Sequence, residues 1–360
     1  MSWDDWAQLR LREIDGLGRT RALSVADDAG LVSFASNDYL ALSQHPLVIE
    51  ASIEATQRWG TSAQASPLLG GRRDIHVELE AALAAWKGRE AAVVLPSGFA
   101  TNLGVVTALG NRQATVFSDE LNHASIVDGC RLSTAQVCVY RHNDLDHLVD
   151  LLAAHAGPAV IVSDLVFSMD GDLADVDGLA RVVRARDDVV VILDEAHAVF
   201  HHEIPLDAFG DNLIRVGTLS KTLGSVGGFV AASRSMVDLL INTARPLIFS
   251  TGLPPSCAAA ANAALGLVTS GEMDEEIDRL GQLSRQLDPN AASQIVPFVV
   301  GSEQRAVESS ARLLAHGFYV PAIRPPTVAP GTCRLRVALN TRHRSEDIEQ
   351  LKVTLDEVLQ

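Results

Sequence analysis

Short apolar runs recur along the chain, and each is followed by small or polar residues and then by a helical segment. Four of these runs are residues 91–95, 115–118, 159–163 and 189–193. Strands that alternate with helices in this way form a mostly parallel sheet covered by helices on both faces. Ligands of such sheets bind beyond the carboxyl ends of the strands. The pattern therefore predicts an α/β fold and directs the search for a site to the residues that follow the runs.

The composition fits a large α/β protein and argues against several classes of function. The chain has 360 residues, of which 47% are hydrophobic and 5% aromatic, so it can bury a sizeable core. Its net charge of -16 argues against a nucleic-acid partner, because such binding depends on neutralising phosphates. No apolar run approaches membrane-spanning length, so no membrane partner is expected.

The N-terminus and the cysteines indicate the compartment. Residues 1–6 are acidic and aromatic, unlike a signal peptide, and a cytoplasmic location is expected. The four cysteines are scattered without the spacing of a metal site, which predicts free thiols and no bound metal.

The strongest chemical signal combines a lysine with a carboxylate. The run 189–193 ends at Asp194 and His197, and the segment 217–224 places Lys221 among small residues. A lysine amine forms a Schiff base with an aldehyde once its pKa is lowered. Its natural aldehyde partner is pyridoxal 5'-phosphate (PLP), whose ring nitrogen needs a carboxylate, here Asp194. His197 is placed to hydrogen-bond the ring oxygen.

The same residues allow a second interpretation as a nucleotide site. Residues 194–197 also match the magnesium-binding box of helicases, and Lys221 with its following threonine ends like a phosphate loop. That loop requires G-x-x-x-x-G-K-[ST], whereas Ser220 precedes the lysine and Arg215 occupies the first glycine position. The lysine also follows the acidic strand instead of preceding it. The pattern favours carbonyl chemistry, with a helicase-like ATPase as the alternative.

Two further strand ends carry candidate residues. The run 91–95 leads into residues 96–102, where small residues open a helix. Free amides at a helix N-terminus bind anions, and a cofactor phosphate would fit there. His123 follows the run 115–118, from where an imidazole can stack on a pyridine ring and act as an acid. Without Lys221, an ordinary turn and a surface histidine would be the simpler interpretations.

The C-terminal part contributes cationic candidates. Arg336 lies among apolar residues of an expected strand, and a buried guanidinium requires a partner. We expect a carboxylate from the protein or from a substrate. Residues 323–332 form a proline-rich loop that would hold Arg324 and Thr327 in place.

Three parts are expected along the chain. Residues 1–40 form an N-terminal helix and short strands, residues 41–255 a large α/β domain, and residues 256–360 a small α+β domain. Helices are expected near residues 3–16, 46–59, 74–86, 144–156, 179–186, 235–242, 303–316 and 345–359, and further strands near 31–35, 135–140, 227–232, 296–300 and 334–340.

Six segments follow one another in the order typical of a known family. They are residues 36–40, 96–99, 122–125, 167–172, 194–197 and 217–221. On these segments the chain resembles the α-oxoamine synthases, which are PLP enzymes of fold type I. The resemblance extends from about Ser33 to the C-terminus. It implies a mostly parallel central sheet flanked by helices, with a smaller α+β C-terminal domain.

The resemblance implies roles for individual residues. Lys221 would form the Schiff base, Asp194 would pair with the ring nitrogen, and His123 would stack on the ring and take part in catalysis. The other implied contacts to the cofactor ring or phosphate are Ser168, His197, Gly98, Phe99, Thr218 and either Ser250 or Thr251, the last reaching the phosphate of a neighbouring subunit. The expected substrate contacts are Asn37, Arg324, Thr327 and Arg336, which matches an arginine that grips the amino-acid carboxylate.

The choice of reaction rests on residues 323–328, which resemble the version in members that act in biotin biosynthesis. Those members condense L-alanine with a pimeloyl thioester, carried on coenzyme A or on a carrier protein, to 8-amino-7-oxononanoate. A sister enzyme that uses glycine and a short acyl-CoA is the alternative within the family. A non-catalytic PLP-binding regulator is the alternative outside it. A homodimer with shared active sites is also implied.

The chain departs from the family pattern at three places. Pro67 stands where a basic residue is usual, Asp164 stands where a glutamate is common, and residues 280–296 are contracted. The N-terminal arginine that meets the acyl chain has no clear match, with Arg10 and Arg12 as candidates. Acyl specificity is therefore the least constrained expectation.

Overall fold

A computed structural model describes residues 1–21, 23, 30–200 and 204–360 of the chain. Its contacts divide it into two compact units. The large unit comprises Asn37–Ser168 and Asp172–Arg279, and the small unit comprises Met1–Ser36, Met169–Gly171 and Leu280–Gln360. The domain boundaries expected near residues 40 and 255 stay predictions about parts that fold separately.

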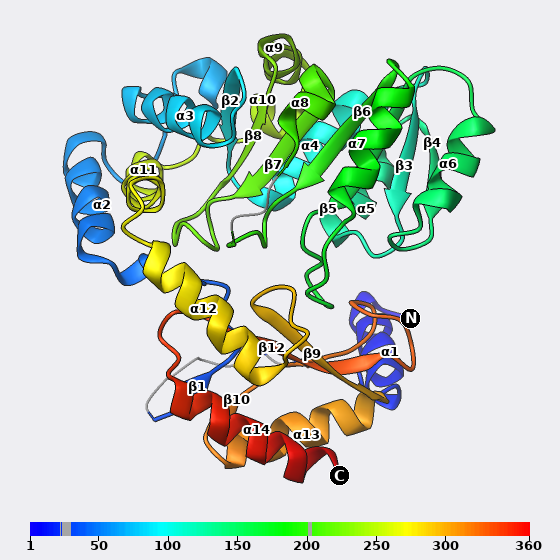
Figure 1. The fold of residues 1–360 in the computed structure, drawn as a ribbon, viewed down its shortest axis with the longest axis vertical. Coiled ribbons are helices and arrows are strands. Elements are labelled where there is room, and N and C mark those ends of the chain that lie inside the picture. The colour runs from blue at the N-terminus through cyan, green and yellow to red at the C-terminus, as the bar shows by residue number, and fades with distance from the viewer. Residues whose placement is uncertain (22, 24–29, 201–203) are drawn as a thin grey trace. The chain divides into compact units, whose positions relative to one another are not determined.

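A seven-stranded sheet forms the centre of the large unit (Figure 1). Its strand order is β2-β8-β7-β6-β5-β3-β4, and β8 alone among the seven runs opposite to the other strands. The other six therefore end at the same edge. The strands are β2 Ala91–Leu95, β3 Thr115–Asp119, β4 Gln136–Tyr140, β5 Ala159–Asp164, β6 Val189–Asp194, β7 Leu213–Thr218 and β8 Gly228–Ala232.

Helices cover both faces of this sheet. Alternate strand residues such as Val160 and Ile214 share one core with Val106 and Ile126 from the helices, because successive strand side chains point to opposite faces. Helix α7 packs against β6 and α6 against β4. The helices of this unit are α2 Pro46–Trp59, α3 Asp74–Trp86, α4 Gly98–Leu109, α5 Ala124–Leu132, α6 Leu145–Ala153, α7 Val176–Ala185, α8 Leu206–Phe209, α9 Arg234–Thr243, α10 Arg245–Phe249 and α11 Pro255–Thr269, with 3-10 turns η1 Leu42–Gln44, η2 Pro67–Leu69 and η3 Gly210–Asn212.

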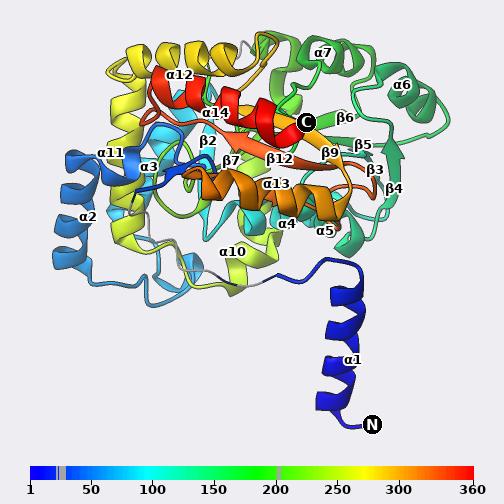
Figure 2. The ribbon, with the colours of Figure 1, turned by 90° about the horizontal axis from the view of Figure 1, so that it is seen from below.

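The small unit is built on a three-stranded antiparallel sheet. Its strand order is β11 Ala322–Ile323, β12 Cys333–Ala338 and β9 Ile295–Gly301. Helices α13 Glu303–Ala315 and α14 Ser345–Leu359 lie side by side over it (Figure 2). Strands β1 Val32–Ser33 and β10 Phe318–Tyr319 pair parallel. Helix α1 Trp3–Gly16 has no buried residue, and α12 Asp274–Leu287 carries the chain from the large unit into the small one.

The expected helices and strands are confirmed, but seven elements were not expected. They are β7, β10, β11, α5, α8, α10 and α12. Strand β7 contains Arg215, a buried charge that interrupts the apolar run by which strands are recognised. Helix α12 is rich in charged residues and falls partly in the segment that was interpreted as a contraction. No helix in the described part of the chain is both long and apolar enough to cross a membrane.

Candidate active site

Lys221 lies just beyond β7 and ends a chain of polar side chains. Its Nζ is 2.8 Å from His197 Nε2, and His197 Nδ1 is 2.6 Å from the Tyr39 hydroxyl. Tyr39 donates its one hydroxyl proton to Asn37 Oδ1 at 2.9 Å, so Tyr39 accepts the Nδ1 proton of His197. The neutral imidazole then accepts from the Lys221 amine at Nε2. The loop before η1 thus orients the histidine that contacts the lysine.

Asp194 ends β6 as a buried carboxylate held by neutral donors. Its Oδ1 accepts the Ala196 N–H at 2.8 Å, and its Oδ2 accepts Asn102 Nδ2 at 2.5 Å. The parallel register places Asp164 of β5 directly beside it. Burial and the negative charge of Asp194 raise the pKa of Asp164 well above its usual value. Asp164 therefore gives up its proton less readily than an ordinary carboxyl group.

His123 caps the N-terminus of α5 at the same edge of the sheet. Its backbone N–H donates to Asp164 Oδ2 at 2.9 Å, and its ring Nδ1 accepts the Ser125 N–H at 3.3 Å. Burial lowers the pKa of His123, an effect that Asp194 opposes and Lys221 reinforces. The imidazole therefore stays neutral at pH 7. Phe99 approaches it edge-on, with ring centroids 6.5 Å apart.

The start of α4 forms a cradle of backbone beside Thr218. A Cβ added at Gly98 would lie 3.1 Å from Thr218 Cβ, and one at Gly228 would lie 2.8 Å from Gly98 Cα. Ser97 caps the helix by accepting the Ala100 N–H. The N–H groups of Gly98 and Phe99 precede the first intrahelical hydrogen bond, so they are available to an anion.

The chain contains three lysines, and their surroundings differ. Lys87 is buried and its Nζ donates to Glu195 Oε2 at 2.8 Å. Lys352 is exposed on α14 of the small unit. Lys221 is half-buried at the strand ends, with the imidazole of His197 as a partner. Its position is the one suited to attack a carbonyl group beside Asp194 and His123.

The other expected residues are less closely tied to this cluster. Ser168 is buried in the loop after β5, and Thr251 is exposed between α10 and α11. Arg324, Thr327 and Arg336 belong to the small unit. Arg336 is confirmed as a buried residue of β12, opposite Pro297 of β9. The roles expected for these five residues stay predictions.

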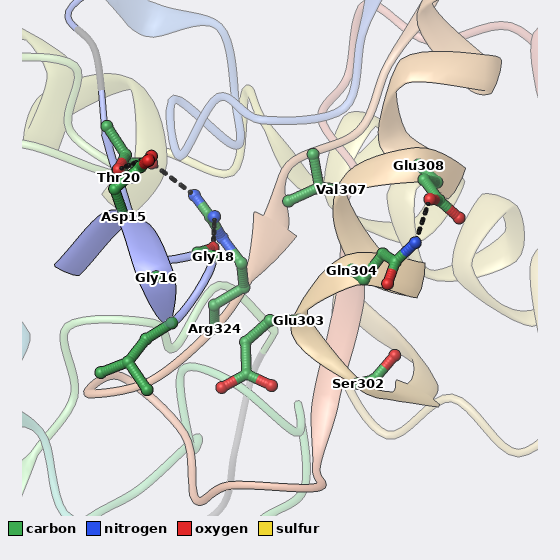
Figure 3. Close-up of a pocket in the computed structure, with 11 residues that line it drawn as sticks. Asp15, Gly16, Gly18, Thr20, Ser302, Glu303, Gln304, Val307, Glu308 and Arg324 are labelled. Atoms are coloured by element: carbon green, nitrogen blue, oxygen red, sulfur yellow. Dashed lines mark hydrogen bonds between the residues drawn. The ribbon is translucent and has the colours of Figure 1, made fainter. Parts of the chain in front are cut away.

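Arg324 joins its loop to the segment that follows α1. It donates to the carbonyl oxygens of Gly18 at 2.6 Å and Thr20 at 3.4 Å. Figure 3 shows these contacts at the edge of a cavity of about 700 Å³ in the small unit. Arg21 donates to Pro325 O of the same loop at 3.0 Å, whereas Arg10 is exposed on α1 and pairs with Glu13. The N-terminal arginine at this loop is therefore Arg21.

Four residues of the cluster were not singled out as site residues from the sequence. They are Tyr39, Asn102, Ser125 and Asp164. Two of them had a local signal, because Asn102 lies one helical turn after Gly98 and Ser125 lies two residues after His123. Within the described ranges, no three His, Cys, Asp or Glu side chains gather as a metal site.

The comparisons place the chain among known proteins. Residues 29–353 match the family model described as aminotransferase class I and II. The chain belongs to the class I and II aminotransferase family. A relative from Geobacter sulfurreducens named 8-amino-7-oxononanoate synthase is 44% identical over 359 residues, which cover 94% of this chain and 91% of the relative. A second relative of that name, from Methylobacterium sp., is 42% identical over 371 residues, with 99% and 97% covered.

A solved structure supports the same assignment. The serine palmitoyltransferase of S. paucimobilis, which carries PLP joined to myriocin, matches with a TM-score of 0.89 at 26% identity, covering 98% of this chain and 96% of that chain. The expected fold type, the resemblance to the α-oxoamine synthases and the cofactor PLP are thus confirmed. The protein is a PLP-dependent acyltransferase of this family.

The residues at the strand ends fit PLP chemically. A buried carboxylate, Asp194, suits a protonated ring nitrogen, and the α4 cradle beside Thr218 suits a phosphate. Lys221 offers an amine and His197 a hydrogen bond beside it. His123 adds a neutral aromatic ring. The large unit therefore contains every type of group that the cofactor requires.

Proposed function

We propose that this enzyme condenses L-alanine with a pimeloyl thioester. The products are 8-amino-7-oxononanoate, carbon dioxide and the free thiol of the acyl carrier. The observation that supports this choice most directly is the identity of 44% and 42%, over nearly the whole chain, to relatives named 8-amino-7-oxononanoate synthase. A role in biotin biosynthesis follows from those names. The pimeloyl group is carried on coenzyme A or on a carrier protein.

Lys221 is the proposed covalent anchor of PLP and the base of the reaction. When bound, PLP supplies an electron sink for negative charge on the substrate α-carbon. Once its amine is free, Lys221 would remove the α-proton of alanine. His197 accepts a hydrogen bond from this amine at 2.8 Å, and this bond orients the Lys221 nitrogen. Tyr39 and Asn37 in turn fix the orientation of the His197 ring.

Asp194 and His123 are proposed to stabilise the charges that develop during the reaction. Asp194 balances the positive charge of the ring nitrogen, because its own hydrogen bonds come from neutral groups. His123 donates a hydrogen bond to the thioester oxygen as negative charge builds on it. Ser168 and His197 are the proposed contacts on the oxygen side of the ring. Gly98, Phe99 and Thr218 are the proposed phosphate contacts.

The small unit is proposed to bind the substrates. Arg336 holds the carboxylate of alanine until that group leaves as carbon dioxide. Arg324 and Thr327 are the proposed contacts to the acyl substrate. Asn37 of the large unit is a further proposed substrate contact. Arg21 joins them in this proposal, because its hydrogen bond to Pro325 O places it at the same loop.

The protein is further proposed to act as a homodimer in the cytoplasm. Thr251 is exposed on the segment between α10 and α11, as expected of a residue that serves the phosphate of a second copy. Light scattering on the purified protein tests the oligomer. The Thr251→Ala variant tests the shared site through weakened PLP retention.

The test of the reaction is a two-by-two assay on the holoenzyme. L-Alanine and glycine are each combined with pimeloyl-CoA and acetyl-CoA, and thiol release and product mass are measured, with the carrier-protein thioester as an additional acyl donor. We expect the product of alanine and the pimeloyl group at a kcat/KM at least about tenfold above every other pair. Preference for glycine with acetyl-CoA would contradict the proposal in favour of a sister enzyme. PLP binding without turnover would indicate a regulator.

A further inference from the structure

A continuous hydrogen-bonded path joins Asp194 to His123 through two side chains with no role so far. Asn102 Nδ2 donates to Asp194 Oδ2 at 2.5 Å and to Ser125 Oγ at 3.0 Å. Ser125 Oγ lies 2.7 Å from His123 Nδ1. Both protons of the Asn102 amide are used in this path, one at each end.

The donors and acceptors of this path fix the position of every proton. Ser125 Oγ accepts from Asn102, and its own single proton has His123 Nδ1 as its acceptor. The Ser125 backbone N–H also donates to Nδ1, at 3.3 Å. A nitrogen that accepts two hydrogen bonds carries no proton, so the proton of the neutral imidazole resides on Nε2.

The path is buried and closely packed. Asn102, Ser125 and Asp194 are 2%, 0% and 4% exposed, so bulk water does not reach the hydrogen bonds of the path. Helices α4 and α5 approach closely at Gly129, where an added Cβ would lie 2.9 Å from Val106 Cβ. This contact brings Asn102 of α4 within reach of Ser125 of α5. The Asn102 Oδ1 atom is buried without a donor among the described residues, so the amide is oriented by its two donated bonds.

We infer that Asn102 and Ser125 are positioning residues that hold His123 in its Nε2–H tautomer and fix its orientation relative to Asp194. This inference deepens the proposed function and rests on the role given there to His123. In this arrangement His123 donates a hydrogen bond from Nε2 without first taking up a proton. His123 thus acts as a donor with a fixed orientation. The side-chain amide of Asn102 also orients the carboxylate of Asp194.

The groups around His123 support a fixed neutral ring. Asp194 and Lys221 act on it through space with opposite signs, the carboxyl group of Asp164 binds its backbone N–H, and Phe99 contacts its edge. Burial is the largest influence and lowers the pKa of His123. Protonation at Nδ1 would also leave the Ser125 hydroxyl proton without its acceptor. Loss of the Ser125 hydroxyl therefore raises the pKa of His123 toward its ordinary value.

The test is nitrogen NMR of histidine-labelled protein, with and without PLP, in which the His123→Asn spectrum assigns the His123 signals. In the unsubstituted protein we expect a proton on Nε2 and none on Nδ1 from pH 7 to 9. Ser125→Ala should give a mixture of tautomers and lower kcat about tenfold, with little change in the KM for alanine. Ser125→Thr, which retains the hydroxyl, should restore the single tautomer. Ser284→Ala is the matched control, because Ser284 is equally buried and its hydroxyl donates within its own helix to the carbonyl of Leu280.

Asn102→Asp is the second variant. It keeps the shape of the side chain but replaces a donor by an acceptor that faces Asp194, so the His123 tautomer should again become mixed and PLP should bind more weakly. A proton on Nδ1 in the unsubstituted protein, or an unchanged tautomer in both Ser125→Ala and Asn102→Asp, would overturn the inference. The tautomer is measured without turnover. A correct tautomer together with no product from alanine would therefore contradict only the proposed function.

Discussion

Asp194 and Glu195 are consecutive, buried and acidic, yet the protein surrounds them in opposite ways. Glu195 contacts two cations, because Lys87 Nζ and Arg215 Nη2 each donate to its Oε2 at 2.8 Å. Asp194 receives hydrogen bonds from a backbone N–H and the Asn102 amide. Burial alone would raise the pKa of Glu195, but Lys87 and Arg215 lower it.

This difference indicates that the charge of Glu195 is structural, whereas the charge of Asp194 is available to a ligand. The charge of Glu195 is compensated within the protein, and its partner Arg215 also bonds the Lys87 carbonyl at 2.7 Å. The charge of Asp194 is oriented but not neutralised by its hydrogen-bond donors. A buried carboxylate of this kind is suited to a cationic partner such as a protonated ring nitrogen. Four predictions test this distinction.

Glu195→Gln should have the largest effect, and the effect should be on stability. Removing the negative charge leaves Lys87 and Arg215 buried against each other, at a cost of about 3–5 kcal/mol in the free energy of unfolding. Urea denaturation measures it. The triple variant Lys87→Met, Glu195→Gln, Arg215→Met should lose less than Glu195→Gln alone, because no unpaired charge remains. A loss below about 1 kcal/mol for Glu195→Gln would show that the cluster is not structural.

Asp194→Asn should have the converse effect. The substitution keeps the shape, so the free energy of unfolding without PLP should change by less than about 1 kcal/mol. The rate of alanine α-proton exchange should fall about 10²–10³-fold, since the charge opposite the ring nitrogen is lost. Deuterium exchange monitored by NMR measures this rate. Normal exchange in this variant would contradict the role proposed for Asp194.

Tyr39→Phe should produce a smaller loss, confined to function. It removes the acceptor of the His197 Nδ1 proton, so the ring that contacts Lys221 becomes less well oriented. We expect a decrease of about tenfold in kcat, the size of one lost hydrogen bond. Tyr319→Phe, at a half-exposed tyrosine of β10, is the control and should keep full activity. Equal rates in the two variants would exclude the polar chain from the reaction.

His142 extends the comparison to a cation between two carboxylates and should show the smallest effect. Burial opposes its charge, but the hydrogen bonds that its ring donates to Asp119 and Asp172 raise the pKa of His142 to about 10. Its contribution to stability is thus complete below its ordinary pKa of 6.5 and declines as pH rises toward 10. The stability difference between the unsubstituted protein and His142→Asn should shrink between pH 6 and pH 9.5. The exposed His316 provides the control variant, and a difference that grows with pH would contradict the assignment.

The sequence predicts the parts of the site that depend on strand ends. Apolar runs identify β2, β3, β5 and β6, and their shared edge brings His123, Asp194 and the start of α4 together. Motif order adds Lys221 and His197. These inferences hold because apolar runs and motifs can be recognised from neighbouring residues in the sequence.

The remaining features depend on packing that no local pattern encodes. Strand β7 is missed because it contains Arg215, a buried charge whose partners are Glu195, the residue after β6, and the carbonyl oxygen of Lys87. Asn102 reaches Asp194 across 92 positions of sequence, and Arg21 reaches Pro325 across 304. Such contacts arise from helix packing and chain crossing. In the sequence alone, nothing distinguishes Asn102 and Arg21 from other polar residues.

The central claim is that Lys221 is the lysine that binds PLP. The decisive measurement is borohydride reduction of the holoenzyme, followed by peptide mass mapping of the lysine that retains the cofactor. The chain offers only Lys87, Lys221 and Lys352, so the result distinguishes three candidates. The account predicts the adduct on Lys221 alone. An adduct on Lys87 or Lys352, or retained PLP with Lys221 unmodified, would contradict it.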